Sequence, residues 1–535
     1  MHAMQRKLMA VVAVAAMGLP QWAIAQDSTQ PAKKDSTRVE REAPATARDL
    51  RELKELIEAQ QKQIDELRQQ AQQREEKLQQ TEQQLAETKK SADDASQKAA
   101  AAVSSDEVAA LKADVNGVKE TLTNTILTAQ DEQKRTSLLE NTLGRFRWSG
   151  DARVRWEDFN QSGAEARNRE RIRIRFGFDS KLGDDFSAGV ALATGGFTGS
   201  FASGSEPAYD GTSTNETLTG DFNRKNISLD RGFVTYNPKA HPWISVTGGK
   251  FAYTWARTSV TFDPDLNPEG FSEKLSFDVK NSFVKNVSLV GMQLSYNETY
   301  KQTTPAPDSW AYGFQAGMKL QPASWWTLTP TYTLLNWKLP NAILTNNDTA
   351  AFNPNGISNC VNSTATPTKY CSGFLYSDLI LANVFTTPWK RMPLNLTAEF
   401  ERNLHAAGVV ATDGSRHYRR NAYFADLSLG QQKNRNDVQV GYTFNREEQD
   451  AAISAFGESD QRWPTNVLQH KLYANYKIRS NVQLGFTEWI GRALDSSLPV
   501  IGGWAYAPGY GPGTAGAGLH EPMLKRSQID LVFTF

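Results

Sequence analysis

Residues 437–445 are Asp-Val-Gln-Val-Gly-Tyr-Thr-Phe-Asn, and this stretch determines the fold class. Apolar side chains occupy every second position from Val438 to Phe444, so a strand here places all of them on one face. The same alternation occurs in 171–178 and 394–401. Strands of this kind suit a sheet that has lipid on one face and water on the other.

Sixteen segments with this character follow one another from residue 146 to the C-terminus. Short polar connections such as 183–185 alternate with long polar ones such as 338–372, which is typical of outer-membrane barrels. The sequence therefore predicts a transmembrane antiparallel β-barrel of about sixteen strands over 146–535, with eighteen as the alternative count. The expected strand starts are near 147, 169, 185, 224, 243, 269, 286, 309, 325, 374, 393, 421, 436, 466, 481 and 524.

The last strand and the tryptophans support the same register. Apolar residues alternate from Ile529 to Phe535, and this ending resembles the C-terminal signal that the bacterial assembly machinery recognises in outer-membrane barrels. Eleven tryptophans fall near predicted strand ends, as two interfacial girdles require. The girdle at the periplasmic ends is predicted to contain Trp148, Trp243, Trp325, Trp326 and Trp389, and the outer girdle Trp156, Trp255, Trp310, Trp337, Trp463 and Trp489.

Three segments precede the barrel. Residues 1–25 have two basic residues, an apolar run and a small-residue cleavage site, which predicts a secretory signal peptide. Residues 26–46 are polar and proline-containing, which predicts a disordered linker. Residues 47–143 have heptads of Leu, Ile and Ala that predict a periplasmic α-helical coiled coil; a single amphipathic helix on another surface is the alternative.

The bulk composition narrows the function classes. Lys+Arg and Asp+Glu both number 59, so no net charge argues for a nucleic-acid partner. After residue 25, no stretch approaches the roughly 18 apolar residues that a spanning helix needs. The two cysteines, Cys360 and Cys371, lie in one long loop of an exported chain, which predicts a disulfide; a redox or metal pair is the alternative.

Three stretches carry a family resemblance. Asn168–Arg175, the turn 182–185 and Phe262–Gly270 resemble the corresponding stretches of a family of bacterial putative porins, best over residues 146–300. Members of this family pair a helical N-terminal segment with a barrel. The resemblance implies a porin-type channel without an assigned substrate.

The alternation predicts which charged side chains face the lumen. If Val154 and Ile172 face lipid, the arginines on either side of them line the pore, and a column of arginines favours anions. The alternative is a balanced lumen, in which glutamates such as Glu157 and Glu170 face the arginines across the barrel. The predicted pore-lining residues are Arg153, Arg155, Arg171, Arg173, Arg175, Glu399, Glu401, Lys471 and Lys477.

The constriction is predicted in the loop after the fifth strand, 256–268, with Arg257, Asp263 and Asp265 as candidates. The loop 198–221 is the alternative. Arg231 has the parity of lipid-facing residues, so we expect a bulge at Arg231-Gly232 that turns its charge away.

From these patterns we expect an outer-membrane porin of a Gram-negative bacterium that allows passive diffusion of small hydrophilic solutes or ions. A structural tether to the cell wall through the coiled coil is one alternative. An outer-membrane hydrolase using His470 is the other, although no serine partner is evident. The expected partners are outer-membrane lipid, two further copies in a homotrimer, and peptidoglycan or a periplasmic protein; we expect no catalytic residue, metal or cofactor.

Overall fold

The computed structural model describes residues 146–195, 211–218, 222, 224–298, 308–345, 356–410, 416–502, 505–514 and 520–535. They all lie in the second of two compact units, Leu127–Phe535. The predicted signal peptide, linker and coiled coil lie outside the described residues and stay predictions. Within the described ranges, no helix is long and apolar enough to cross a membrane.

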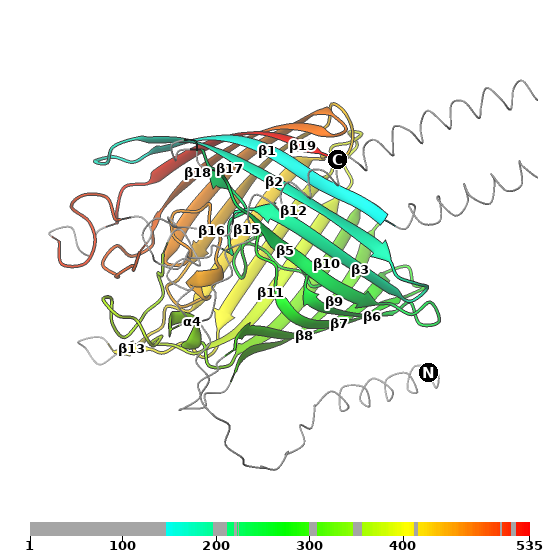
Figure 1. The fold of residues 1–535 in the computed structure, drawn as a ribbon, viewed down its shortest axis with the longest axis horizontal. Coiled ribbons are helices and arrows are strands. Elements are labelled where there is room, and N and C mark those ends of the chain that lie inside the picture. Colours follow the sequence, from blue (N-terminus) through cyan, green and yellow to red (C-terminus); the bar gives the residue numbers. More distant parts are fainter. Residues whose placement is uncertain are drawn as a thin grey trace, which may run out of the picture. The chain divides into compact units, whose positions relative to one another are not determined.

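The described residues form a closed antiparallel barrel of sixteen strands (Figure 1). Each strand pairs with the next along the chain, and β19 pairs with β1 to close the sheet. A two-residue strand, β4 (Glu216–Thr217), adds to the edge of β2. The barrel strands are β1 (Phe146–Asn160), β2 (Arg167–Lys181), β3 (Phe186–Thr194), β5 (Ile227–Tyr236), β6 (Ile244–Lys250), β7 (Glu269–Asp278), β8 (Val284–Asn297), β9 (Ser309–Ala323), β10 (Trp326–Trp337), β11 (Phe374–Phe385), β12 (Leu394–Asn403), β15 (Asn421–Gly430), β16 (Val438–Glu447), β17 (Val467–Arg479), β18 (Val482–Ala493) and β19 (Leu524–Thr534).

The predicted barrel of sixteen strands is confirmed, and the alternative count of eighteen is wrong. The largest difference in a strand start is at β5, predicted from 224 and observed from Ile227. The pattern located the strands this well because closure satisfies every backbone hydrogen bond within the sheet, and lipid then requires apolar side chains at every second position.

The two rims of the barrel differ in their connections. One rim, here called the turn rim, has short connections such as 182–185 and 480–481. The other, the loop rim, has long ones such as 338–373 and 448–466. Three short elements lie in these long connections: α4 (Ala342–Thr345), the hairpin of β13 (Val409–Val410) and β14 (Arg416–His417), and the 3₁₀ turn η3 (Ser454–Phe456).

The outward face of the barrel is apolar. In β16, Val438, Val440 and Tyr442 are 40%, 43% and 39% exposed, whereas the alternate Thr443 and Asn445 are buried inside. Exposed apolar residues at alternate positions recur in other barrel strands, for example in β2 and β18. Since a barrel has no unpaired edge, such a surface is stable in hydrocarbon.

The predicted tryptophan girdles are correct at one rim and wrong at the other. At the turn rim, Trp148, Trp325 and Trp389 are exposed, as an interfacial girdle requires. At the loop rim, Trp156 is exposed, but four of the predicted members are buried. These are Trp255, Trp337, Trp463 and Trp489, which lie in inward-folded loops or at inward strand positions.

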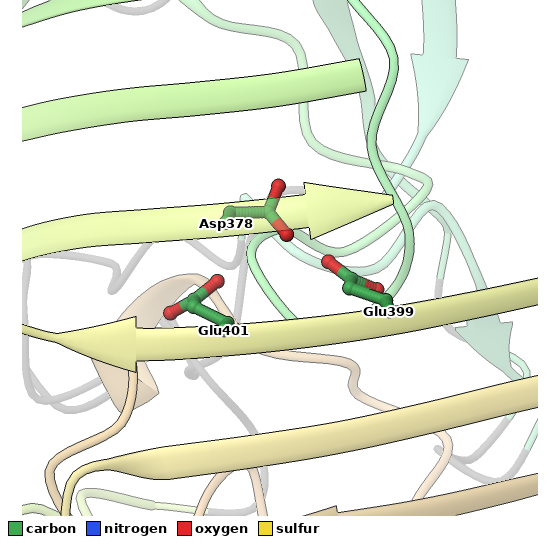
Figure 2. Close-up of side chains that lie close together, drawn as sticks. All are labelled: Asp378, Glu399 and Glu401. Atoms are coloured by element: carbon green, nitrogen blue, oxygen red, sulfur yellow. The ribbon is translucent and has the colours of Figure 1, made fainter. Parts of the chain in front are cut away.

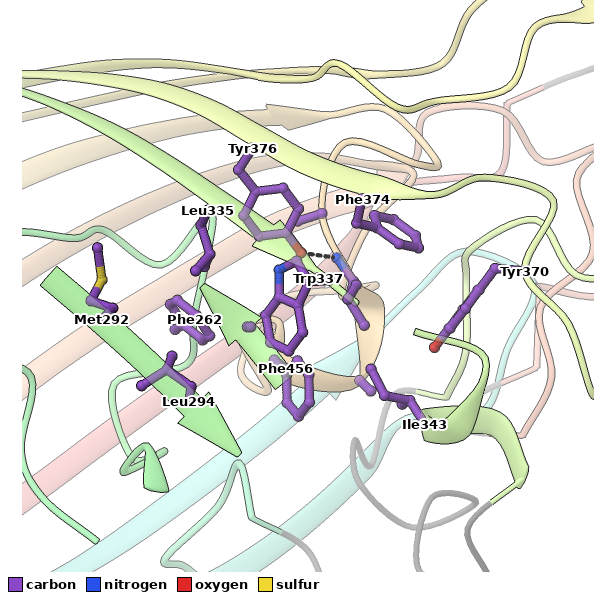
Figure 3. Close-up of a cluster of buried hydrophobic side chains, with 14 of the residues drawn as sticks. Phe262, Met292, Leu294, Leu335, Trp337, Ile343, Tyr370, Phe374, Tyr376 and Phe456 are labelled. Atoms are coloured by element: carbon purple, nitrogen blue, oxygen red, sulfur yellow. Dashed lines mark hydrogen bonds between the residues drawn. The ribbon is translucent and has the colours of Figure 1, made fainter. Parts of the chain in front are cut away.

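Two of these buried tryptophans, Trp255 and Trp337, belong to an apolar core inside the barrel, which is unexpected for a lumen predicted to be hydrated. Inward side chains of β8 to β11 pack against the loops 251–268, 338–373 and 448–466 (Figure 3). Trp337 stacks on Phe456 with ring centroids 5.1 Å apart, and the Tyr376 hydroxyl accepts a hydrogen bond from the Ile453 N–H at 2.8 Å. Burial of each such side chain contributes about 1.5–3 kcal/mol, so the three loops are held inside by their own apolar residues.

The loop 338–373 is further fixed by a disulfide. Cys360 and Cys371 are bonded, with Cα atoms 5.3 Å apart. The neighbouring Tyr370 is buried in the apolar core. The cross-link therefore holds the loop segment that contributes Tyr370 to this core.

A bulge corrects the facing of Arg231. The pairing of β3 with β5 shifts register between Ala191 and Leu192, which leaves Asp230 as the extra residue. The expected bulge is thus present, one residue before the predicted Arg231-Gly232. It turns Arg231 toward an internal cavity instead of lipid.

Candidate functional site

One wall of the lumen is basic. Strands β1, β2 and β19 are neighbours, and alternate positions on them direct arginines inward. Arg153 lies directly opposite Arg173, and Arg155 opposite Arg171. The basic wall consists of Arg153, Arg155, Arg171, Arg173, Arg175 and Arg526.

Carboxylates neutralise Arg155 and Arg526 of the basic wall. Arg155 Nε donates to Asp530 Oδ1 at 2.7 Å, and its Nη1 donates to Asp460 Oδ2 at 2.8 Å. Arg526 Nη2 donates to Glu157 Oε1 and to Asp460 Oδ1, both at 2.7 Å. Buried guanidinium groups need such charged partners, because an unpaired charge in a low-dielectric interior is costly.

Asp460 reaches the basic wall from the loop 448–466. Burial alone would raise the pKa of its carboxyl, but Arg526 and Arg155 outweigh burial and hold the pKa well below the usual range. For the neighbouring Glu458, burial and Asp460 outweigh the opposing effect of Lys471 and raise the pKa to about 7. This loop therefore has one carboxylate that stays ionised and another that titrates near neutral pH.

The loop 251–268 supplies the next carboxylate. Arg175 lies between Asp151 of its own wall and Asp265 of this loop, with nitrogen-to-oxygen distances of 2.7 and 3.4 Å. The Thr214 hydroxyl also donates to Asp265, at 2.8 Å. Of the predicted constriction candidates, the structure thus brings Asp265 to the basic wall.

The other two candidates of this loop lie away from the arginines. Asp263 is buried and accepts the Ser459 N–H at 2.7 Å, so it joins the two inward loops. Burial, Glu458 and Asp265 raise the pKa of Asp263 well above its ordinary value. Arg257 lies over the Tyr253 ring, 4.1 Å from its centroid, and donates to the Phe262 carbonyl at 3.1 Å.

Glu399 and Glu401, which the balanced arrangement would pair with the arginines, are in none of the ion pairs of the described residues. They lie on β12, where they gather with Asp378 of β11 into an acidic cluster (Figure 2). Of the glutamates expected opposite the arginines, Glu157 does contact them, whereas Glu170 is exposed. The charge balance of the basic wall comes instead from Asp151, Asp265, Asp460 and Asp530.

The two lysines lie on inward positions of β17. Lys471 Nζ is 4.7 Å from the ring centroid of the inward Trp489. Lys477 is buried and donates to the Ser480 carbonyl at 3.2 Å, close to the turn rim. The ammonium group of Lys477 is therefore already hydrogen-bonded to the backbone.

A cavity of about 740 Å³ lies between the inner face of β1, β2, β3 and β5 and the loop 251–268. Its lining has three arginines and three carboxylates: Arg175, Arg231, Arg257, Asp151, Asp230 and Asp265. Arg175 is the member of the basic wall that remains partly exposed, at 35% of its side chain. This cavity is large enough for a small hydrated solute and has no excess of either charge.

Sequence reasoning missed the loop 448–466 as an inward element. It proposed 256–268, or else 198–221, of which the described part 211–218 also contacts the basic wall through Ser213 and Asn215. The signal that was available is composition. A loop exposed to water has little reason to contain Ile453, Phe456 and Trp463, all of which are buried here.

His470, on which a hydrolase would depend, is on the outward parity of β17. Its Nδ1 lies 2.7 Å from the Tyr442 hydroxyl, and its ring packs near Phe444. These are contacts of an aromatic surface group.

Part of the barrel is similar to a known protein family. A family model described as putative porin matches residues 159–370. No curated protein matches the chain. Among solved structures, Pseudomonas putida OprB is similar at 11% identity and a TM-score of 0.43, over 75% of this chain and 96% of that one. Salmonella typhi OmpF, in complex with daunomycin, is similar at 9% identity and 0.38, over 73% and 97%. Vibrio cholerae OmpT, described as a trimer form, is similar at 9% and 0.37, over 73% and 99%.

The family match and the geometry agree with the resemblance found in the sequence. Residues 159–370 run from the end of β1 to the loop before β11 and include eight complete barrel strands. This chain therefore has a closed sixteen-stranded barrel, and the part of it from residue 159 to residue 370 is similar to the family described as putative porin.

Proposed function

We propose that this chain is an outer-membrane porin that lets small hydrophilic solutes and ions diffuse passively. The observation that carries the proposal is the closed sixteen-stranded barrel, apolar outside, whose interior holds a charged cavity of about 740 Å³. A sheet of this kind is stable in lipid, and side chains with fixed charges give a hydrated ion an alternative to bulk water.

The contacts support a weak ion preference over a strong anion preference. A column of free arginines would favour anions, but Arg155, Arg173 and Arg175 each have a carboxylate within 3 Å. The cavity lining is likewise balanced, with three groups of each sign. A solute at this position therefore meets paired charges, and size rather than charge sets its rate of passage.

The two inward loops narrow the lumen together. Asp263 of the loop 251–268 bonds to Ser459 of the loop 448–466, and both loops pack through Phe262 and Phe456 on the apolar core. We therefore include the loop 448–466 in the constriction that the sequence placed at 256–268 alone.

Planar-bilayer conductance of the purified full-length protein tests the proposal. We expect steady current steps whose size is proportional to the applied voltage, with a reversal potential close to zero in a salt gradient. A barrel that served only to anchor a coiled coil would show no steady current. A reversal potential near the value for a pure anion conductor would instead support the arginine column.

The proposal includes a homotrimer whose coiled coil extends into the periplasm. Both features rest on sequence reasoning, and the coiled coil lies outside the described residues. Chemical cross-linking of the full-length protein in detergent, against a variant lacking residues 47–143, separates them. Trimers in both proteins would place the contact in the barrel, and trimers in the full-length chain alone would place it in the helices.

A further inference from the structure

The acidic cluster contains three buried carboxylates on adjacent strands. Asp378 of β11 lies directly opposite Glu401 of β12, and Glu399 is two residues from Glu401 on the same inward face. Their exposed fractions are 2%, 0% and 5%. One oxygen from each of the three lies within 4.8 Å of the others. In Figure 2 the Asp378 carboxylate lies between those of the two glutamates.

This cluster has no cationic partner among the described residues. Its members take part in none of the ion pairs found there, which contrasts with the carboxylates at the basic wall. Thr258 donates to one oxygen of Glu399. Within the described part of the chain, both oxygens of Glu401, the second of Glu399 and Asp378 Oδ1 are buried without a hydrogen-bond partner.

Such an arrangement is too costly to stand alone. Buried polar atoms in folded proteins almost always have a partner, and three adjacent carboxylates repel one another strongly in a low-dielectric site. Either protons or a cation must compensate them. Glu401 is fully buried, and neither of its oxygens has a partner among the described residues, so this carboxylate in particular is left uncompensated there.

We propose that Asp378, Glu399 and Glu401 bind a divalent cation of the calcium class. The donors are all carboxylate oxygens, which hard cations prefer to the nitrogen and sulfur ligands that select transition metals. Calcium binds oxygens at about 2.3–2.6 Å, so two ligands on opposite sides of it are about 4.6–5.2 Å apart. The three donor atoms lie within 4.8 Å of one another, so a single ion of this size can contact all three.

The surroundings extend the site. Thr333 of β10 lies directly opposite Asp378, and Thr258 comes from the inward loop 251–268. Hydroxyl oxygens of this kind complete a coordination sphere of six to eight together with water. A bound divalent cation would therefore join three strands of the barrel to the loop that narrows the lumen, and it would offset two of the three negative charges of the cluster.

Calcium titration of the full-length protein tests this inference without relying on conductance. The protein is purified in detergent, stripped with chelator, dialysed and titrated with CaCl₂ in a calorimeter. We expect one more calcium ion bound by the wild type than by Glu401→Gln, or an affinity lowered at least about tenfold in the variant. Calcium should also raise the unfolding temperature of the wild type, because a ligand that binds only the folded state stabilises it.

Asp426→Asn is the matched control. Asp426 is a carboxylate on the neighbouring β15 that already accepts hydrogen bonds from Thr443 and Tyr473. This variant should bind calcium as the wild type does. Equal calcium affinity in the wild type and Glu401→Gln would overturn the inference. Absence of calcium uptake by the wild type would also overturn it, whatever the variants do, and would mean that protons compensate the cluster.

Discussion

The basic wall and the acidic cluster are both buried, charged and on inward strand positions, yet they differ in how their charge is compensated. At the basic wall, carboxylates of two strands and two loops surround the arginines, with distances such as 2.7 Å from Arg155 to Asp530. In the acidic cluster, both oxygens of Glu401 lack a partner among the described residues. The comparison indicates that carboxylates of the chain compensate most of the basic wall, whereas the acidic cluster is arranged for a ligand.

The largest expected effect comes from breaking the compensation of the basic wall. Asp460→Asn removes a charge that contacts both Arg155 and Arg526, whose side chains are 6% and 5% exposed. Breaking a buried ion pair costs about 3–5 kcal/mol, since it leaves the other charge uncompensated. Urea unfolding of the protein in lipid vesicles measures this loss. Asp184→Asn, which removes an exposed pair with Lys239, should leave the midpoint unchanged.

If Asp460→Asn unfolds at the wild-type urea midpoint, the contrast between the basic wall and the acidic cluster is wrong. The arginines of the basic wall would then be solvated through the cavity rather than held by the loop 448–466. Protease cleavage of that loop is the second measurement, because a loop released from Arg155 and Arg526 is exposed to cleavage, whereas a packed one is protected.

Removing a carboxylate charge from the acidic cluster should stabilise the folded protein, whereas removing one from the basic wall should destabilise it. In chelator, Glu401→Gln removes a buried carboxylate that has no partner among the described residues and that only a proton could compensate, so we expect stabilisation of about 1–3 kcal/mol. In saturating calcium, the wild type should gain stability and the difference should shrink or reverse. The same urea unfolding measures both conditions. Destabilisation by Glu401→Gln in chelator would mean that the carboxylate already has a favourable partner.

A smaller effect is expected from pH, through the loop that supplies Asp460. Burial and Asp460 raise the pKa of Glu458 to about 7, above the value of an unfolded chain, with Asp265 adding to this and Lys471 opposing it. The folded state then binds more protons than the unfolded one between about pH 4.5 and 7, so stability falls as pH rises through this range. Glu458→Gln should flatten that slope. An equal slope in both proteins would assign it to other carboxyls, such as Asp263.

The sequence predicted the strands far better than the loops, for a physical reason. Lipid imposes a period of two on every barrel strand, so the starts of the sixteen barrel strands could be located by pattern alone. Loops have no such constraint, and no periodicity shows that Asp460 would meet Arg155. The direction of Trp337 was also ambiguous, because Leu334 and Leu335 make both faces of β10 apolar near its end.

For the candidate site, the sequence likewise predicted which strand residues point inward but not which residues they contact. Parity correctly directed Arg153, Arg155, Arg171, Arg173 and Arg175 to the inner face, since one residue more or less would have placed them in lipid. It could not show their partners. Glu399 and Glu401 were selected by parity too, but the third member, Asp378, is on another strand, and register between strands is not visible in a single sequence.

The smallest effect concerns the cavity of about 740 Å³, which Arg175 of the basic wall lines. Arg175→Ala leaves two arginines and three carboxylates in the lining, so cations should gain preference and the reversal potential in a salt gradient should move accordingly. Asp151→Asn changes the balance by one charge in the other direction and should move it oppositely by a similar amount. If the arginines instead form a column that selects anions, the wild type is already strongly anion-selective. Asp151→Asn then changes the reversal potential little. Opposite shifts about a wild-type value near zero therefore support paired charges, whereas a shift in Arg175→Ala alone supports the column.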